Sequence, residues 1–336
     1  MDTDLILLGH GSGGSLSHQL LDELVLPTVS GLAADQQNDA ALLETVAGRL
    51  AFTTDGYVVD PLIFPGGSIG SLAVHGTVND LAMMGARPLW LSCGLIIEEG
   101  FSRTELAELL TDLRRAADRA GVQVVTGDTK VVPRGKADRL FITTSGVGRI
   151  EHDLVINGAN AQPGDCIILS GSAGDHGMAV LAAREGLDAG GLQSDSAPLW
   201  QLVEALMETA GAGLHVLRDP TRGGVATTLK EIATQSGVLL TIDEAAIPVK
   251  PQVKGLCGML GLDPLFVANE GKLLAFVAPD RAEAALEALR RLPLGRDAAI
   301  IGRVEQGEPG RVRMQTAVGG MRMIEMLAGE QLPRIC

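Results

Sequence analysis

Short apolar segments typical of β-strands alternate along this chain with amphipathic helical segments, and glycine separates many of them. Residues 50–54 read as a strand, and Ser102 opens a capping box with Glu105 ahead of a helix that carries leucine along one face. Strands are predicted next at 122–125 and 140–144. The chain holds 43 glycines but only six Phe, two Trp and one Tyr, so we expect tight turns and an aliphatic core. This alternation is typical of α/β folds.

The same alternation begins again after a Pro163-Gly164-Asp165 turn. Strands are predicted at 166–170, 239–242, 272–277 and 299–304, and helices at 199–209, 224–235 and 281–292. The interval 151–163 is the least periodic, and a length of 336 residues suggests two domains. The sequence therefore predicts an N-terminal domain over 1–150, a C-terminal α/β domain over 151–328 and a flexible tail over 329–336.

The charge balance excludes several classes of partner. Lys and Arg number 27 against 41 Asp and Glu, for a net charge of −14, so we expect no nucleic-acid partner, and phosphate binding would need cations. No run of 18 apolar residues occurs, and Met1-Asp2-Thr3-Asp4 is not the basic start of a signal peptide. Three cysteines in apolar surroundings lack CxxC spacing: Cys93, Cys166 and Cys257. We expect a soluble, cytoplasmic protein without a membrane partner, whose three cysteines are buried.

The fourth cysteine, Cys336, is the last residue of the chain. Chain ends are usually poorly ordered, and the eight residues from Gly329 could extend about 26–29 Å. The position suggests a reactive thiol on an arm able to enter and leave a pocket. A chance exposed cysteine is an equally good interpretation of position alone.

Aspartates recur just beyond apolar segments in the first half of the chain, at Asp39, Asp55, Asp80 and Asp128. Loop carboxylates anchored to rigid elements suit a Mg²⁺ site shared with substrate phosphates. Asp-Gly and Asn-Asp pairs are also ordinary turn chemistry, and the sequence does not show that the four converge.

Three glycine-rich loops open helical segments, at 9–15, 170–177 and 218–224. Backbone N–H groups at helix starts bind anions, and glycine allows close approach. None of the loops matches the P-loop or the dinucleotide fingerprint. His10 and His176 lie in two of these loops, where phosphate contact and turn stabilisation are equally compatible with the sequence.

Taken together and in order, the motifs closely resemble the HypE family of hydrogenase maturation proteins. The resemblance runs from Gly9 to Cys336 and rests on His10-Gly11-Ser12-Gly13-Gly14, Thr53-Thr54-Asp55-Gly56-Tyr57, Gly76-Thr77-Val78-Asn79-Asp80, Thr126-Gly127-Asp128-Thr129-Lys130, Asp175-His176-Gly177, Arg218-Asp219-Pro220-Thr221-Arg222-Gly223-Gly224, Asn269-Glu270-Gly271-Lys272 and Pro333-Arg334-Ile335-Cys336. It implies the fold of the aminoimidazole ribonucleotide synthetase superfamily. It also implies a homodimer whose N-terminal strands form a shared barrel, with ATP sites near the subunit interface.

The resemblance also implies an activity. In this family the partner HypF carbamoylates the C-terminal cysteine with carbamoyl phosphate, and ATP is consumed to dehydrate the thiocarboxamide to a thiocyanate. The cyanide then passes to iron held by the HypC–HypD complex, for nickel–iron hydrogenase. Dehydration needs a better leaving group than the amide oxygen, and a positioned general base.

Carried over by motif, the resemblance gives each candidate residue a role. Cys336 would carry the carbamoyl and cyano groups, and Glu270 would be the dehydration base. Lys130 would compensate phosphate charge. The nucleotide would be bound by Gly11, Ser12, Gly13, Gly14, Asp55, Asn79, Asp80, Asp128 and Lys130, and Mg²⁺ by Asp39, Asp55, Asp80 and Asp128. Without the resemblance, Glu270 would be interpreted as a turn or cap carboxylate and Lys130 as a solvated lysine.

Two alternatives remain at this point. One is another ATP-dependent enzyme of the superfamily, although selenophosphate synthetase uses a reactive residue in its N-terminal glycine-rich region and no cysteine here precedes Cys93. A phosphoribosyl synthetase or kinase would have no use for Cys336. The other is a non-catalytic protein whose tail is a docking peptide. ATP turnover that depends on a carbamoylated Cys336 would separate these alternatives.

Overall fold

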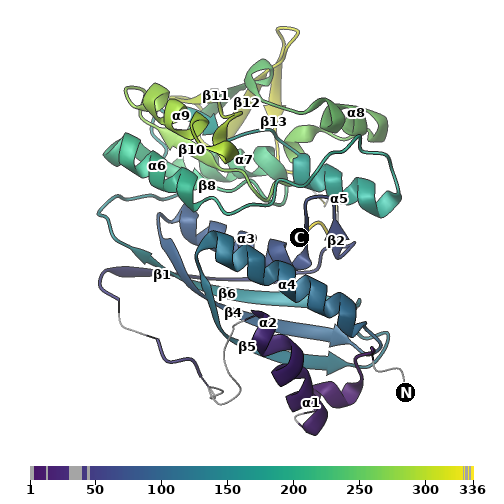
Figure 1. The fold of residues 1–336 in the computed structure, drawn as a ribbon. Helices are drawn as coiled ribbons and strands as arrows, with labels where there is room; N and C mark the ends of the chain where they lie inside the picture. Colours follow the sequence, from purple (N-terminus) through teal and green to yellow (C-terminus); the bar gives the residue numbers. More distant parts are fainter. Residues whose placement is uncertain are drawn as a thin grey trace.

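The computed structural model describes residues 4–12, 14–29, 40–43, 46–327, 329, 332 and 334–336. Two β-sheets, each with its own helices, are stacked one above the other, and helix α3 lies between them (Figure 1). Residues 151–165, which connect the two halves, contain no helix or strand.

The N-terminal half is built on a four-stranded sheet with the order β1-β6-β4-β5. The strands are β1 (Arg49–Tyr57), β4 (Arg87–Glu98), β5 (Gln123–Val132) and β6 (Leu140–Ile150). The β4–β5 pair is parallel and the other two pairs are antiparallel. Helices α3 (Ile69–Met83) and α4 (Arg103–Ala120) pack against the sheet, and the hairpin of β2 (Ile63–Phe64) and β3 (Gly67–Ser68) precedes α3. A short 3₁₀ turn, η1 (Leu8–Gly11), leads to the consecutive helical segments α1 (Ser15–Leu20), η2 (Leu21–Val25) and α2 (Leu26–Val29).

Helix α4 confirms the amphipathic pattern read from the sequence. Ser102 is its N-cap, and the Ser102 hydroxyl accepts a hydrogen bond from the Glu105 amide at 3.2 Å. The Glu105 carboxylate, however, pairs with Arg139 at 2.5 Å, so only half of the expected capping box forms. Four leucines are buried on the inner face: Leu106, Leu109, Leu110 and Leu113. Each such leucine contributes about 1.5–3 kcal/mol on burial.

The expectation that the aspartates lie in loops is wrong for the three that the structure describes. Asp55 lies within β1, Asp80 within α3 and Asp128 within β5. Helix α3 escaped recognition because all but one of its 15 residues are buried, so it has no amphipathic period; the exception is Asp80. Asp39 and Gly13 lie outside the described residues.

The C-terminal half is built on a seven-stranded sheet with the order β13-β12-β9-β11-β7-β10-β8. Its strands are β7 (Cys166–Leu169), β8 (Leu214–Arg218), β9 (Leu239–Asp243), β10 (Leu274–Val277), β11 (Ala299–Glu305), β12 (Arg311–Gln315) and β13 (Met321–Ile324). Helices α6 (Trp200–Ala210) and α9 (Ala282–Arg290) pack on one face and α7 (Gly224–Ser236) on the other. Helices α5 (Asp175–Glu185) and α8 (Pro251–Leu260) form a separate apolar cluster. The strands and helices predicted for this half are confirmed, whereas β8, α8, β12 and β13 were not foreseen.

Cys93, Cys166 and Cys257 are buried, as their apolar surroundings predicted. Burial raises the pKa of the Cys93 thiol to about 12. None of the helices formed by the described residues combines the length and the apolar content needed to cross a bilayer.

Candidate active site

Four acidic side chains approach one another where the two halves of the molecule meet. They are Asp55 from β1, Asp80 from α3, Asp219 just after β8, and Glu270 from the segment before β10. Thr53, two residues before Asp55 on β1, donates from Oγ1 to Oδ2 of Asp80 at 2.8 Å. The alternation of side chains along β1 therefore directs Asp55 and Thr53 to the face that Asp80 occupies.

All four carboxylates have raised pKa values, and burial is the largest cause for each. For Asp55 and Asp80 the main cause is burial, and the Asp55 charge raises the pKa of Asp80 further. Burial and the Asp80 carboxylate raise the pKa of Asp219 to about 7. Burial, followed by the charges of Asp219 and Asp195, raises the pKa of Glu270 well above its usual range. Such a group of crowded carboxylates favours protons or cations.

Glu270 is held through its backbone, and its carboxylate is left available. The side chain is buried, and within the described part of the protein its Oε1 has no hydrogen-bond partner. Its amide donates to Oδ1 of Asp195 at 3.0 Å. A Cβ on the next residue, Gly271, would lie 1.7 Å from the Asp195 carbonyl oxygen, so only glycine allows this close approach. An unpartnered buried carboxylate oxygen does not fit the role of a turn or cap.

Asn79 has partners other than those expected of a nucleotide ligand. Its Nδ2 donates to the carbonyls of Ala197 at 3.0 Å and Glu270 at 3.2 Å. Its Oδ1 accepts from the Leu199 amide at 2.8 Å, and the residue is buried. These three bonds occupy the amide group. The Asn79 amide thus joins α3 to the loop that carries Glu270.

A second group of candidate residues lies on β5, the edge strand of the N-terminal sheet opposite β1. Lys130 Nζ and Asp128 Oδ1 form an ion pair at 2.8 Å, and both side chains are exposed. The hydrogen bond from Lys130 lowers the pKa of Asp128. A Cβ on Gly11 would lie 2.5 Å from the Val131 amide nitrogen, so the η1 turn rests directly on β5.

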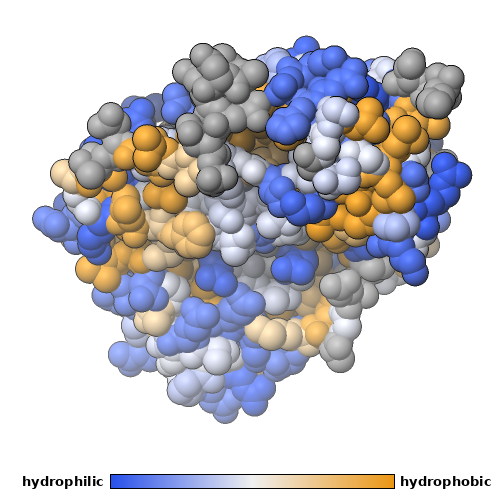
Figure 2. Space-filling view, turned by 90° about the horizontal axis from the view of Figure 1, so that it is seen from below, coloured by the Kyte–Doolittle hydropathy of each residue, from blue (hydrophilic) through white to orange (hydrophobic). Residues whose placement is uncertain are grey.

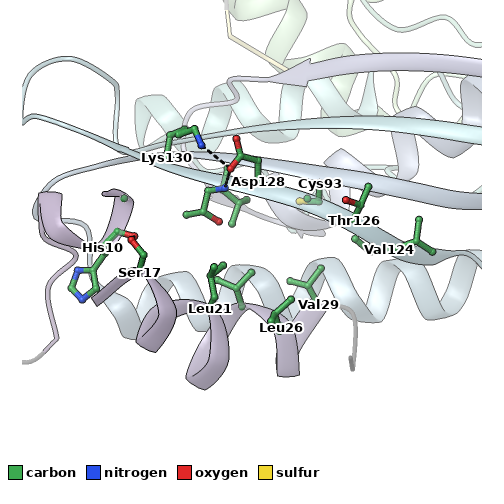
Figure 3. A pocket seen from close by; sticks show the side chains of 16 residues that line it. His10, Ser17, Leu21, Leu26, Val29, Cys93, Val124, Thr126, Asp128 and Lys130 are labelled. Atoms are coloured by element: carbon green, nitrogen blue, oxygen red, sulfur yellow. Dashed lines mark hydrogen bonds and ion pairs between the residues drawn. The ribbon is translucent and has the colours of Figure 1, made fainter. Parts of the chain in front are cut away.

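An apolar cavity of about 270 Å³ adjoins this second group (Figure 3). Helical segments η2 and α2 form one wall, with Leu21, Leu26 and Val29 opposite Val124 of β5. Asp128 and Lys130 line the same cavity. His10 also lines it, but its Nδ1 accepts the Leu7 amide at 2.8 Å, so this histidine closes its own turn.

The other residues of the N-terminal glycine-rich loop have local roles. The Ser12 hydroxyl donates to the Gly9 carbonyl at 2.9 Å, and Gly14 is the N-cap of α1. Both lie at the start of the helical segments that form one wall of the cavity.

One chain does not bring all the predicted Mg²⁺ ligands together. Asp55 and Asp128 lie on the two edge strands of the four-stranded sheet, three strand spacings apart, which is about 14 Å. Within the described ranges, no three His, Cys, Asp or Glu side chains form a group able to hold a metal ion. The chain therefore presents two separate sets of candidate ligands.

The end of the chain is docked near the first set. The Val58 amide donates to the Cys336 carbonyl at 3.1 Å, and the Asp60 amide donates to the Arg334 carbonyl at 3.2 Å. Ile335 is buried, and Cys336 is partly exposed beside a cavity of about 450 Å³. The described tail residues thus lie against the protein instead of projecting from it as a free arm. Their cavity is also lined by Gly56, Arg222 and Ala268.

Sequence reasoning missed two residues of this region. Asp219 lies in a motif that was recognised, but the motif gave no role to its aspartate. Asp195 lies in an irregular segment without any pattern, and its Oδ2 forms a buried ion pair with Lys272 at 2.9 Å. Only the three-dimensional structure shows that Asp195 accepts a hydrogen bond from the Glu270 amide.

Comparisons with known proteins match this architecture along almost the whole chain. The N-terminal and C-terminal domain models of AIR synthase related proteins match residues 37–150 and 162–315. The carbamoyl dehydratase HypE of Cupriavidus necator is 52% identical over 331 residues, covering 98% of this chain and 94% of the relative. The chain belongs to the carbamoyl dehydratase HypE family. Membership makes it an enzyme of hydrogenase maturation, with the two-domain α/β fold that the sequence predicted.

Solved HypE structures agree with this assignment. A crystal structure of HypE in complex with ATP is 51% identical, covers 98% of this chain and 99% of its own, and superimposes with a TM-score of 0.94. A HypE–HypF complex gives a TM-score of 0.80 at 48% identity, covering 84% of this chain and 92% of the HypE-family chain matched there. The HypE fold is therefore present from the N-terminal sheet to the tail.

Proposed function

We propose that this HypE-family chain dehydrates a carbamoyl group carried on its own Cys336 to a thiocyanate, at the expense of ATP. The docked tail is the observation that carries the proposal. Cys336 shares a cavity with Gly56, the neighbour of Asp55, and with Ala268, two residues before Glu270. The thiol is thereby beside the two segments that bear the candidate catalytic carboxylates.

The reaction balances as the loss of one water from the thiocarboxamide. The carbamoyl carbon stays bonded to the Cys336 sulfur while its oxygen leaves and its nitrogen loses two protons, giving S–C≡N. ATP supplies the phosphoryl group that turns the amide oxygen into phosphate, a good leaving group. Glu270 accepts a nitrogen proton, and its unpartnered buried Oε1 is suited to that role.

The nucleotide would occupy the region around β5. The apolar cavity suits a nucleobase, and Lys130 and the N–H groups at the Gly11–Gly14 turn are suited to phosphates. The published complex of a HypE protein with ATP supports ATP as the nucleotide. Mg²⁺ would be held by Asp55, Asp80 and Asp128, with Asp39. The raised pKa values of Asp55 and Asp80 fit a site that receives a cation.

A homodimer would unite the two sets of ligands. The sheet face away from α3 and α4 exposes Leu50 and Phe52 of β1, with exposed fractions of 57% and 70%. Figure 2, viewed from below the N-terminal sheet, shows hydrophobic areas between hydrophilic ones. Large exposed apolar side chains on a sheet favour burial against a second copy. We infer that two sheets form a shared barrel, with residues 1–150 as the dimerising domain, 151–328 as the second domain and 329–336 as the tail.

The partners follow from the same chemistry. The carbamoyl group must be delivered by a carbamoyltransferase, and the published HypE–HypF complex supports HypF in this role. We further infer that the cyano group is passed to iron on a HypC–HypD complex, and that all of these steps occur in the cytoplasm.

Phosphate release tests the proposal. Carbamoylated protein should release one phosphate for each thiocyanate formed, and Cys336→Ala should bind ATP but release none above background. A tail that serves only as a docking peptide predicts equal phosphate release with and without carbamoylation.

A further inference from the structure

His176 makes direct contact with the docked tail. This residue follows the first residue of α5 and is completely buried. Its Nε2 lies 2.9 Å from the carbonyl oxygen of Ile335, and its Nδ1 lies 2.8 Å from the hydroxyl of Ser194. The Phe64 and His176 rings form a T-shaped pair, with ring centroids 5.5 Å apart and an interplanar angle of 88°. Both ring nitrogens are therefore engaged, one of them by the residue before Cys336.

The partners fix the tautomer of the ring. A carbonyl oxygen only accepts hydrogen bonds, so the proton must be on Nε2, and Nδ1 accepts from the Ser194 hydroxyl. The Ser194 oxygen in turn accepts from the Ser196 amide at 3.1 Å. Burial lowers the pKa of His176, which favours this neutral form. The Ser194 hydroxyl thus holds the ring with its N–H directed at the tail.

Two further residues of α5 are adapted to the tail. Arg184 donates from Nη2 to the Arg334 carbonyl at 2.6 Å and from Nε to the Asp60 carbonyl at 2.8 Å. A Cβ on Gly177 would lie 2.5 Å from Cγ1 of Val267 and 3.2 Å from Cδ1 of Leu332, so glycine here leaves room for both side chains. Helix α5 therefore contacts two successive tail carbonyls and leaves room for a tail side chain.

We propose that His176, oriented by Ser194, is a positioning residue that holds the C-terminal tail in its docked state and aims the Cys336 sulfur at the reaction site. The bond to Ile335 is to the backbone immediately before Cys336, so it limits the directions that the terminal side chain can take. The catalytic consequence rests on the proposed function, whereas docking of the unmodified tail does not. This gives the Asp175-His176-Gly177 motif a role that neither phosphate contact nor turn stabilisation supplies.

Thiol labelling of the unmodified protein tests docking directly. Cys336 is partly exposed and the other three cysteines are buried, so the rate of alkylation by iodoacetamide, followed by intact mass, reports on the tail. His176→Leu removes the buried hydrogen bond that holds the tail at Ile335. The tail should then undock more often, and labelling of Cys336 should become about tenfold faster. If that variant does not fold, Ser194→Ala, which removes only the hydroxyl that orients the ring, should also accelerate labelling.

His75→Leu is the matched control. His75 is also buried, and its Nδ1 bonds to the hydroxyl of Ser196, in the same segment as Ser194, at 2.9 Å. No hydrogen bond within the described residues joins its side chain to the tail. Its labelling rate should equal that of the wild type. Equal acceleration in His75→Leu and His176→Leu, or no acceleration in the His176 and Ser194 variants, would overturn the proposal.

The catalytic consequence has its own readout. In carbamoylated His176→Leu at saturating ATP, the single-turnover rate of thiocyanate formation should fall about tenfold. The ATP concentration that gives half of the maximal rate should stay at the wild-type value. An unchanged rate alongside accelerated labelling would overturn the aiming role. If the carbamoylated wild-type protein formed no thiocyanate, the proposed function would be contradicted, but the labelling result on docking would still hold.

Discussion

Asp55 and Asp128 lie almost level with each other on opposite edges of the N-terminal sheet. Asp55 pairs with Thr144 on β6, Thr144 pairs with Cys93 on β4, and the next residue of β4 pairs with Asp128. The two carboxylates are therefore separated by the width of the sheet within one chain. In the proposed homodimer, a site that uses both would take them from two subunits.

Mixed dimers test this sharing of residues between subunits. Asp80→Asn and Asp128→Asn should each abolish ATP-dependent dehydration as homodimers, because each site then lacks a carboxylate. A heterodimer of the two variants holds one intact and one doubly altered site. Random reassembly should therefore restore about a quarter of wild-type activity. No recovery on mixing would mean that both aspartates serve a site within one chain.

Glu270→Gln should separate loading from dehydration. The amide keeps the shape of the carboxyl group but cannot accept the proton, and such losses are typically about 10²–10⁴-fold. Mass spectrometry should show Cys336 accumulating as the thiocarboxamide, with ATP binding retained. Cys336→Ala, which cannot be loaded, provides the reference mass. Rapid formation of the species one water lighter would assign the proton transfer to another group.

The pH dependence of dehydration should reflect the raised pKa of Glu270. A general base acts in its unprotonated form, so the single-turnover rate should rise with pH above the range of an ordinary glutamate. Asp219 is the neighbouring charge that raises this pKa most, after burial itself. Asp219→Asn should therefore move the rising limb to lower pH. A limb that stays in place or moves to higher pH contradicts the assignment of Glu270.

Helices α4 and α3 of the N-terminal half show what the sequence could and could not predict. Helix α4 has an N-cap and a leucine stripe, so its start and inner face were read correctly. Helix α3 is buried on nearly all sides between the two halves, so no period distinguished it from a strand. Strands β1 and β5 continue past their apolar residues because one face of the sheet is open, which led Asp55 and Asp128 to be expected in loops.

The sequence motifs identified some residues of the candidate site but not how these residues are arranged in space. They identified Asp55, Asp80 and Glu270, which the fold brings to one region. They could not reveal that Asp128 lies across the sheet, because strand order is not encoded in the spacing of motifs. The support of Glu270 by Asp195 depends on an irregular segment that no local pattern marks.

Removing one partner of the buried Asp195–Lys272 ion pair, which lies next to Glu270, should strongly destabilise the fold. Burial would raise the pKa of Asp195, but Lys272 and His176 outweigh it and the pKa is lowered. Lys272→Met leaves the Asp195 charge buried without its partner, which typically costs about 3–5 kcal/mol. Denaturant unfolding at neutral pH measures the loss. The loss should shrink as the pH falls and Asp195 becomes protonated.

The exposed pair Arg291–Glu287 offers a control for that measurement. Arg291→Ala should cost less than about 1 kcal/mol, because exposed ion pairs are weak. Equal losses in the two variants would show that the Asp195–Lys272 pair is not a special feature of the site.

The central claim is that Cys336 carries the group that is dehydrated. Intact-mass measurement after incubation with HypF, carbamoyl phosphate and ATP tests it most directly. We expect a carbamoyl adduct confined to Cys336 that loses one water only when ATP and Mg²⁺ are present, and no adduct in Cys336→Ala. An adduct that persists in that variant on Cys93, Cys166 or Cys257, or water loss without ATP, would contradict the account.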